Sequence, residues 1–185
     1  MADVLDESNA SPAHIEVASN FRQIFATFLP CLSAFMIHSS GLIRRGRAML
    51  FLAPNEGGKS TVLVLAGPGG RLNDDQVIIR KKTGKVIEAY GTPFGTLTDG
   101  PLSAPVAGLF FLEKASSFEL SPIHPSDLVK CLWDEHQHYI FFLPKTLKII
   151  AFHLLADLCR QARTFRMKFP KDFIDWDAID RALDR

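Results

Sequence analysis

The segment from Ala53 to Ser60 has the residue types and the spacing that bind a nucleotide phosphate. Its sequence, APNEGGKS, fits the pattern G-x-x-x-x-G-K-[ST] at Gly58, Lys59 and Ser60 and departs from it at Ala53. In such a loop the backbone N–H groups surround phosphate oxygens, the Lys reaches the outer phosphates, and the Ser hydroxyl binds Mg²⁺. The residues predicted to hold the phosphates are Gly57, Gly58, Lys59, Ser60 and Thr61.

The segments on both sides of this loop support the same interpretation. An apolar run over residues 48–52 predicts a buried strand before the loop, and residues 61–66 predict a short helix after it. The N-terminal end of a helix carries partial positive charge and free N–H groups, so it attracts anions. A strand, a phosphate loop and a helix are therefore expected in that order.

Two adjacent carboxylates, Asp74 and Asp75, follow the predicted loop helix. One hypothesis is that they bind Mg²⁺ and deprotonate a hydroxyl, as phosphoryl transfer requires of some group near the phosphates. The alternative is a turn in which Asn73, Asp74 and Asp75 only cap the backbone. Adjacent side chains of a strand point to opposite faces, so both acids can face one site only where the strand has ended.

Other elements are expected around this site. Apolar residues at helical spacing predict a helix over 21–28, and residues 35–43 predict a strand that forms a hairpin with 48–52. The further expected strands are 76–80, 85–90, 106–112, 118–120 and 166–169, and the further expected helices are 125–136, 144–163 and 172–184. A loop from Thr92 to Pro105 is long enough to be functional and is the expected entry of an acceptor.

Length and composition indicate one α/β domain with a central mixed sheet. The chain has 185 residues, of which 47% are hydrophobic and 22% charged, with a net charge of +1. We expect a frayed N-terminus over 1–15, a single domain over 16–185, and a cytoplasmic protein with neither a nucleic-acid nor a membrane partner. The three cysteines are expected to be reduced and partly buried. The pair His136 and His138 is expected on the surface.

The ordered set of His38, the phosphate loop and the Asp74–Asp75 pair resembles the catalytic domain of HPr kinase/phosphorylase. That domain belongs to the phosphoenolpyruvate carboxykinase-like phosphate-loop proteins, and this chain is similar to its small related members over residues 18–180. The resembling segments are His38 to Gly41, Ala53 to Ser60, Leu72 to Asp75, Gly91 to Pro93, and Leu109 to Glu113.

The resemblance implies an ATP- and Mg²⁺-dependent kinase that phosphorylates a hydroxyl of a protein, peptide or small molecule. It implies that Lys59 contacts the outer phosphates, that Ser60 and Asp75 bind the metal, and that Asp74 or Asp75 is the base. His38 is expected beside the phosphates. Related kinases are often oligomers, so the resemblance is compatible with a homo-oligomer. The sequence itself leaves the oligomeric state open.

Ala53 and Glu56 stand where the family pattern has glycine, which keeps a second hypothesis open. A Cβ disfavours the left-handed backbone region, and the Glu56 carboxylate lies close to an anionic ligand. The alternative is therefore a nucleotide- or partner-binding module of the same fold with little or no catalysis. The family's later segment with an acceptor-side Arg has no match, so HPr is not the expected acceptor.

Overall fold

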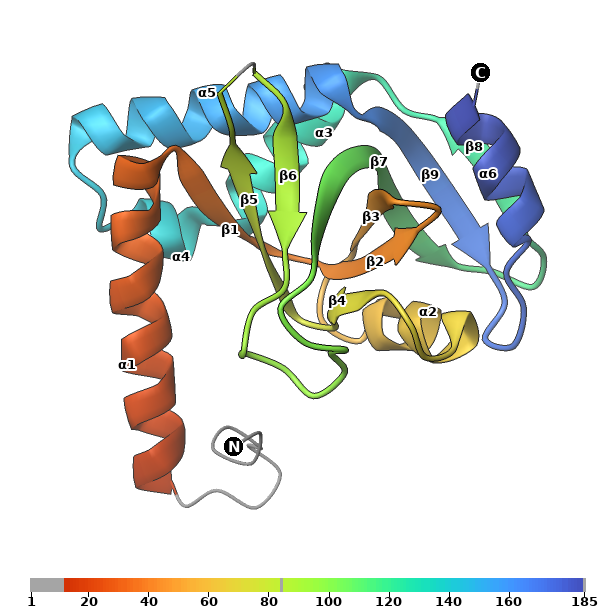
Figure 1. The fold of residues 1–185 in the computed structure, drawn as a ribbon, viewed down its shortest axis with the longest axis horizontal. Coiled ribbons are helices and arrows are strands. Elements are labelled where there is room, and N and C mark those ends of the chain that lie inside the picture. The colour runs from red at the N-terminus through yellow and green to blue at the C-terminus, as the bar shows by residue number, and fades with distance from the viewer. Residues whose placement is uncertain (1–11, 84, 185) are drawn as a thin grey trace.

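The long strand β7 (Ser103–Lys114) joins the two parts of a nine-stranded mixed sheet. Its first residues pair antiparallel with β6 (Ile87–Tyr90), and its later residues pair parallel with β3 (Arg47–Leu52) and β9 (Arg163–Phe169). One part of the sheet has the order β1-β5-β6-β7, and the other runs β4-β2-β3-β7-β9-β8. The predicted α/β class with a central mixed sheet is confirmed (Figure 1).

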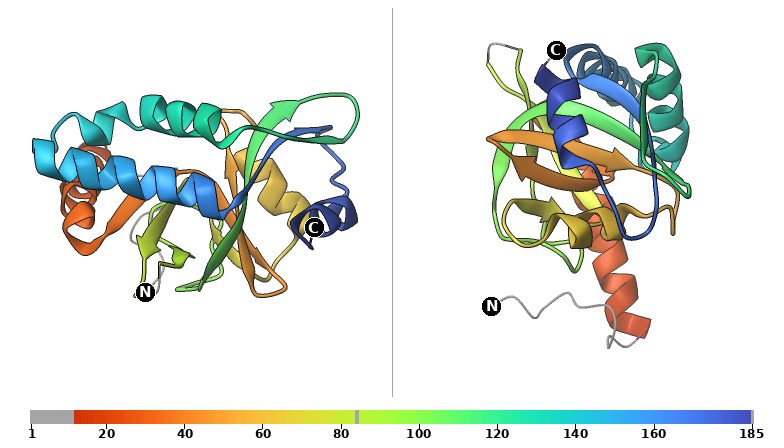
Figure 2. Two further views of the ribbon diagram at one scale, coloured as in Figure 1. Left: turned by 90° about the horizontal axis from the view of Figure 1, so that it is seen from above. Right: turned by 90° about the vertical axis from the view of Figure 1, so that its right-hand side faces the viewer.

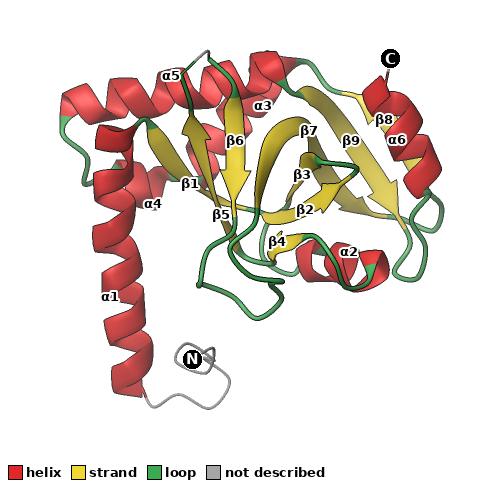
Figure 3. Ribbon diagram, in the orientation of Figure 1, coloured by secondary structure: helices red, strands yellow, loops and turns green. Residues whose placement is uncertain are grey.

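The computed structural model describes residues 12–83 and 85–184 (Figure 3). The other strands are β1 (Ala34–His38), β2 (Ser40–Arg44), β4 (Arg71–Asn73), β5 (Gln76–Lys81) and β8 (Glu119–Pro122). The helices are α1 (Pro12–Phe28), the 3-10 helix η2 (Leu29–Leu32), α2 (Lys59–Ala66), α3 (Pro125–Glu135), α4 (Gln137–Ile140), α5 (Lys145–Gln161) and α6 (Trp176–Asp184). Of the tail expected to fray, residues 1–11 lie outside the described residues, and residues 12–15 belong to α1.

The expected hairpin is present, but the strand expected over 35–43 is two strands. β2 and β3 pair antiparallel, with Arg44 opposite Arg47 at the turn. β1 instead pairs with β5, in the other part of the sheet. The chain crosses between the two parts at the buried Ser39, within the polar residues His38 to Ser40 that separate two apolar runs. The sequence does not show that β1 takes a different partner from β2, because that partner, β5, is distant in the chain.

Alternate residues of β3 and β7 supply two separate hydrophobic clusters, because successive side chains of a strand point to opposite faces. Leu50 and Leu109 belong to the first cluster, and Phe51 and Phe110 to the second. Helices α3 and α5 cover the first face, as Figure 2 shows from above, whereas α2 and α6 contribute to the second cluster. The sheet is thus covered on both faces by helices.

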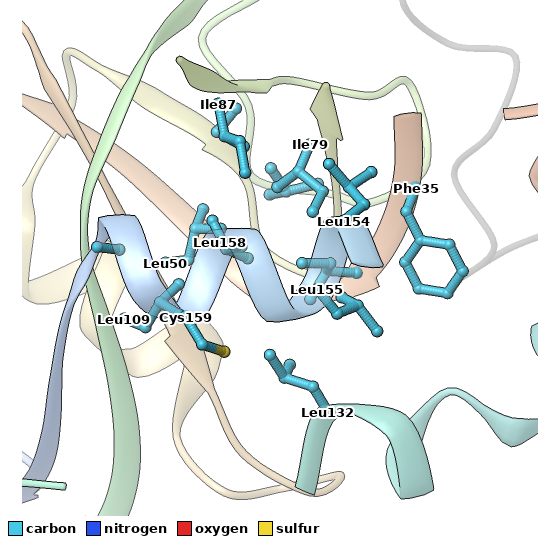
Figure 4. Close-up of a cluster of buried hydrophobic side chains, with 14 of the residues drawn as sticks. Phe35, Leu50, Ile79, Ile87, Leu109, Leu132, Leu154, Leu155, Leu158 and Cys159 are labelled. Atoms are coloured by element: carbon cyan, nitrogen blue, oxygen red, sulfur yellow. The ribbon is translucent and has the colours of Figure 1, made fainter. Parts of the chain in front are cut away.

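Helix α5 lays its apolar side into the first cluster (Figure 4). Leu154, Leu155, Leu158 and Cys159 are all buried there, and each fully buried Leu contributes on the order of 1.5–3 kcal/mol. The expectation of three partly buried thiols is wrong, because Cys31 and Cys131 are exposed. Both lie on the outer sides of the helical segments η2 and α3.

Helix α1 extends well past the sheet along one side of the molecule (Figure 1). It contacts η2 and α4 and leaves apolar side chains such as Phe21 and Phe28 exposed. No helix in the described part of the chain is both long enough and apolar enough to cross a bilayer.

Candidate phosphate-transfer site

The predicted phosphate loop connects the end of β3 to the start of α2. Gly58, with a φ of 100°, precedes the first helical residue, and no side chain caps the helix there. The first N–H groups of a helix have no partner within it, so those of Gly58 to Thr61 are available to an anion. A Cβ on Gly58 would lie 2.8 Å from the Phe169 ring, and one on Gly57 would lie 2.4 Å from the Ala53 Cβ. Both glycines are therefore needed for close packing of the loop.

The two departures from the loop pattern have different consequences. Ala53 does not have a positive φ, so its Cβ causes no backbone strain. Glu56 has a φ of 61°, in the left-handed region that costs a non-glycine residue about 1–2 kcal/mol. The side chain of Glu56 is exposed and lines the same cavity as Lys59. The backbone thus keeps a glycine-like shape at Glu56 without a glycine.

The Lys59 side chain bonds back to the first residues of the loop. Its Nζ donates hydrogen bonds to the backbone oxygens of Ala53, at 2.8 Å, and Pro54, at 3.2 Å. The residue is only 7% exposed, and its burial lowers the pKa of the ammonium group. The carboxylates of Asp75 and Glu135 oppose that effect. A phosphate entering the loop would exchange with the two carbonyl oxygens as the partner of this ammonium.

Asp74 fixes the loop that follows β6. One of its oxygens accepts hydrogen bonds from the backbone N–H groups of Thr96 and Leu97, and the other accepts one from the Thr96 hydroxyl. These three donors order the segment between β6 and β7 around a buried carboxylate. Asp74 therefore positions this loop at the rim of the site.

Asp75 and His38 form a second pair beside the loop. The Nε2 of His38 lies 3.1 Å from an Asp75 oxygen, and its Nδ1 lies 3.0 Å from a Glu135 oxygen. The hydrogen bond with Asp75 raises the pKa of His38 above 6.5. Burial opposes ionisation of Asp75, but His38 and the charges of Arg22 and Lys59 lower the pKa of Asp75 below 3.8. The pair therefore holds a carboxylate next to a readily protonated imidazole.

The turn expected at the two acids is present, and it brings both of them to one cavity. The Asn73 side-chain oxygen accepts from the N–H groups of Asp75 and Gln76, so the segment between β4 and β5 is a capped turn. Because the strand has ended there, both Asp74 and Asp75 line one cavity of 340 Å³. Because these two residues are not in a strand, their side chains are not forced to opposite faces of the sheet.

That cavity brings together most of the residues predicted from sequence. Its lining residues include His38, Gly58, Lys59, Ser60, Thr61, Asp74 and Asp75. Gly57 lies in the loop but does not line the cavity.

No family model matches the chain, and no curated protein matches it in sequence.

Sequence reasoning missed Lys114, Glu135, Thr96 and His136 as neighbours of the site. Lys114 ends β7, and the C-terminal ends of neighbouring parallel strands lie at one edge of a sheet, so pairing of β3 with β7 is the signal that places it. The surface expectation for His136 is wrong. Its Nε2 accepts the His38 backbone N–H at 2.6 Å, and the residue is fully buried. The His138 side chain lies outside the described part.

The donor set around the loop suits a hard divalent cation. Mg²⁺ prefers oxygen ligands and is usually held by one or two carboxylates together with substrate phosphates. The Ser60 hydroxyl and the Asp75 carboxylate line the same cavity and are oxygen donors. Within the described residues no three His, Cys, Asp or Glu side chains form a metal cluster.

Proposed function

We propose that the protein is an ATP- and Mg²⁺-dependent kinase of the HPr kinase-like type that phosphorylates a hydroxyl group. The observation that carries the proposal is the single cavity that joins the uncapped start of α2 and Lys59 to the His38–Asp75 pair. Phosphoryl transfer needs a phosphate cradle, cationic groups and a residue that orients the acceptor, and the start of α2, Lys59 and Asp75 support these three roles in the proposal.

The residues that line the cavity have different proposed roles, which follow from their chemistry. The N–H groups at residues 58–61 and the ammonium of Lys59 bind the phosphates, and Lys114 adds a second cation at the rim. Ser60 would hold Mg²⁺ together with phosphate oxygens, and the cation would neutralise charge on the phosphates. Asp74 positions the loop over residues 91–102, through Thr96 and Leu97.

Asp75 accepts the proton of the acceptor hydroxyl. The acceptor oxygen forms a bond to the γ-phosphorus while the bond from that phosphorus to the oxygen of the leaving ADP breaks. Because the transition state is loose, little proton abstraction is needed before the bond forms, and a carboxylate of low pKa suffices to orient the hydroxyl. His38 keeps the Asp75 carboxylate in place.

The direct test is a calorimetric titration with ATP, with and without Mg²⁺, on the wild type, Lys59→Ala and Lys171→Ala. Loss of a charge-assisted hydrogen bond costs about 1.5–3 kcal/mol, so Lys59→Ala is expected to weaken ATP binding about tenfold to a hundredfold. Lys171 is exposed and outside the cavity, so its variant should bind like the wild type. Absence of ATP binding by the folded wild type contradicts the proposal.

A binding module without catalysis is the second candidate, and Glu56 is the observation that favours it. Its carboxylate lines the cavity in which an anionic substrate would lie. Incubation with labelled ATP, Mg²⁺ and serine-containing acceptors separates the two. ATP binding with no transfer to any acceptor supports the module, whereas transfer that Asp75→Asn abolishes supports the kinase.

A further inference from the structure

A second cavity of 690 Å³ adjoins the phosphate cavity and shares His38, Asn55 and Asp75 with it. It lies between α1, the start of the phosphate loop, the start of β5 and the C-terminal end of α3. Its volume is that of a site for a small molecule or a few residues of a peptide. A ligand in it would lie directly against the His38–Asp75 pair.

The wall of this cavity is rich in carboxylates. Asp75, Asp134 and Glu135 all line it, and the cationic groups among the lining residues are Arg22 and the readily protonated His38. Arg22 already pairs with Asp75 at 3.8 Å, and Glu135 contacts His38. In the described part of the chain Asp134 forms no ion pair, so its charge is not offset. The cavity therefore attracts cations.

A buried hydrogen-bond acceptor on the same wall also requires a donor. Gln76 is 4% exposed, and its Nε2 donates to the Tyr139 hydroxyl at 2.7 Å. Its Oε1 is buried and has no hydrogen-bond partner among the described residues. A buried acceptor without a partner costs about 1–3 kcal/mol, which a donor group of a ligand would recover. This observation is independent of the carboxylates and points to a ligand with a hydrogen-bond donor, a requirement that an ammonium or guanidinium group meets.

We propose that this cavity binds the phosphate acceptor and selects one that carries an ammonium or guanidinium group near its hydroxyl. Such groups are donors only, so they match an orphaned amide oxygen and the Asp134 carboxylate together. The proposal rests on the kinase function proposed above. The hydroxyl lies toward Asp75 and the cation toward Asp134. None of the lining residues comes from Thr92 to Pro105, so the proposed position differs from the entry expected from the sequence.

The test is calorimetric titration, without nucleotide, of two peptides that each carry one serine, flanked in one by lysines and in the other by glutamates. The lysine peptide is expected to bind at least about tenfold more tightly. Aminohexanol serves as a free amino alcohol, and comparison of its affinity with that of the lysine peptide distinguishes a small-molecule acceptor from a peptide. Failure of both cationic probes to bind overturns the proposal.

Variants locate the binding. Asp134→Asn and Asp134→Lys should weaken the cationic probe progressively, the second by about tenfold or more, whereas Asp172→Lys makes the same charge change on an exposed residue outside the cavity and should have little effect. Equal losses from Asp134→Lys and Asp172→Lys would mean non-specific attraction and overturn the proposal. Because no ATP is present, these results stand even if the ATP titration fails. Conversely, phosphate transfer to an acidic or neutral acceptor in preference to a cationic one overturns the cation selectivity proposed here and leaves the proposed kinase function standing.

Discussion

At the scale of single residues, His38 connects three distant parts of the chain. Its backbone N–H bonds to His136, and its ring nitrogens lie against carboxylates of Asp75 and Glu135. An imidazole can donate from both nitrogens only when it is protonated, so two carboxylate neighbours favour the charged form. The raised pKa of His38 has this cause.

The His38–Asp75 pair makes stability depend on pH in a defined window. The raised pKa of His38 gives stabilisation that is full below about 6.5 and is lost as pH rises through the folded-state pKa. The lowered pKa of Asp75 gives stabilisation that is present above 3.8 and is lost as pH falls through its folded-state pKa. We expect the free energy of unfolding gained from the pair to be greatest between these values.

Urea unfolding of the wild type and His38→Gln, from about pH 4 to about pH 9, measures this contribution. The difference between the two proteins should shrink above neutral pH. The control is His153→Gln, which replaces an exposed histidine on α5 and should follow the wild type at each pH. A difference that does not change with pH contradicts the assignment.

Glu56 allows backbone strain to be separated from charge. Glu56→Gly relieves the positive φ and is expected to stabilise the protein by about 0.5–1 kcal/mol, after the greater entropy of an unfolded glycine is counted. Glu56→Ala keeps the strain and removes only the carboxylate. Both should bind ATP more tightly than the wild type. Urea unfolding and ATP titration provide the two measurements, and a destabilised Glu56→Gly would refute the strain argument.

At the scale of elements, the loop between β6 and β7 depends on a single carboxylate. Thr96→Val removes a hydrogen bond to the charged Asp74, and we expect it to cost about 1.5–3 kcal/mol. Thr98→Val is the comparison on the same loop: the Thr98 hydroxyl donates to the neutral Leu72 oxygen and accepts from the exposed Gly100 N–H, which water can satisfy in the variant. It should cost about 0.5–1.5 kcal/mol.

Urea unfolding ranks the two variants, and amide hydrogen exchange at Leu97 reports whether the loop has loosened. Faster exchange is expected in Thr96→Val because the same carboxylate accepts the Leu97 N–H. If Thr98→Val is the more damaging of the two, Asp74 is not the anchor of the loop.

The sequence predicts the elements that are determined by nearby residues. It does not predict features that depend on contacts with distant parts of the chain. The β2–β3 hairpin and helices α3 and α5 follow from local periodicity and turn residues, within a few residues of their observed ends. The split at Ser39 does not, because it depends on β5 as the partner of β1. The candidate site divides in the same way. His38, Lys59 and Asp75 carry motif signals, whereas Glu135 and Thr96 reach the site only through tertiary contacts.

At the scale of the whole molecule, Cys159 provides a measure of global opening. Its burial in the cluster under α5 raises the pKa of the thiol to about 12, so almost no thiolate exists in the native state near neutral pH. In the double variant Cys31→Ser and Cys131→Ser, we expect labelling by a thiol reagent to occur only from the unfolded protein. The labelling rate should therefore rise with urea in parallel with the loss of circular dichroism. Rapid labelling of the native protein would contradict the burial of this residue.

The position of β7 has a consequence for dividing or rearranging the chain. Its partners β6 and β3 precede it in sequence, and β9 follows it. A cut before or after β7 therefore separates it from at least one partner and exposes, as a new edge, a strand that is internal in the intact sheet. Complementation from two separately expressed halves should therefore require that both be present during folding. Insertions and new termini are better placed in surface turns, such as the hairpin turn at Gly46, where an added Cβ would have no neighbour within 4 Å.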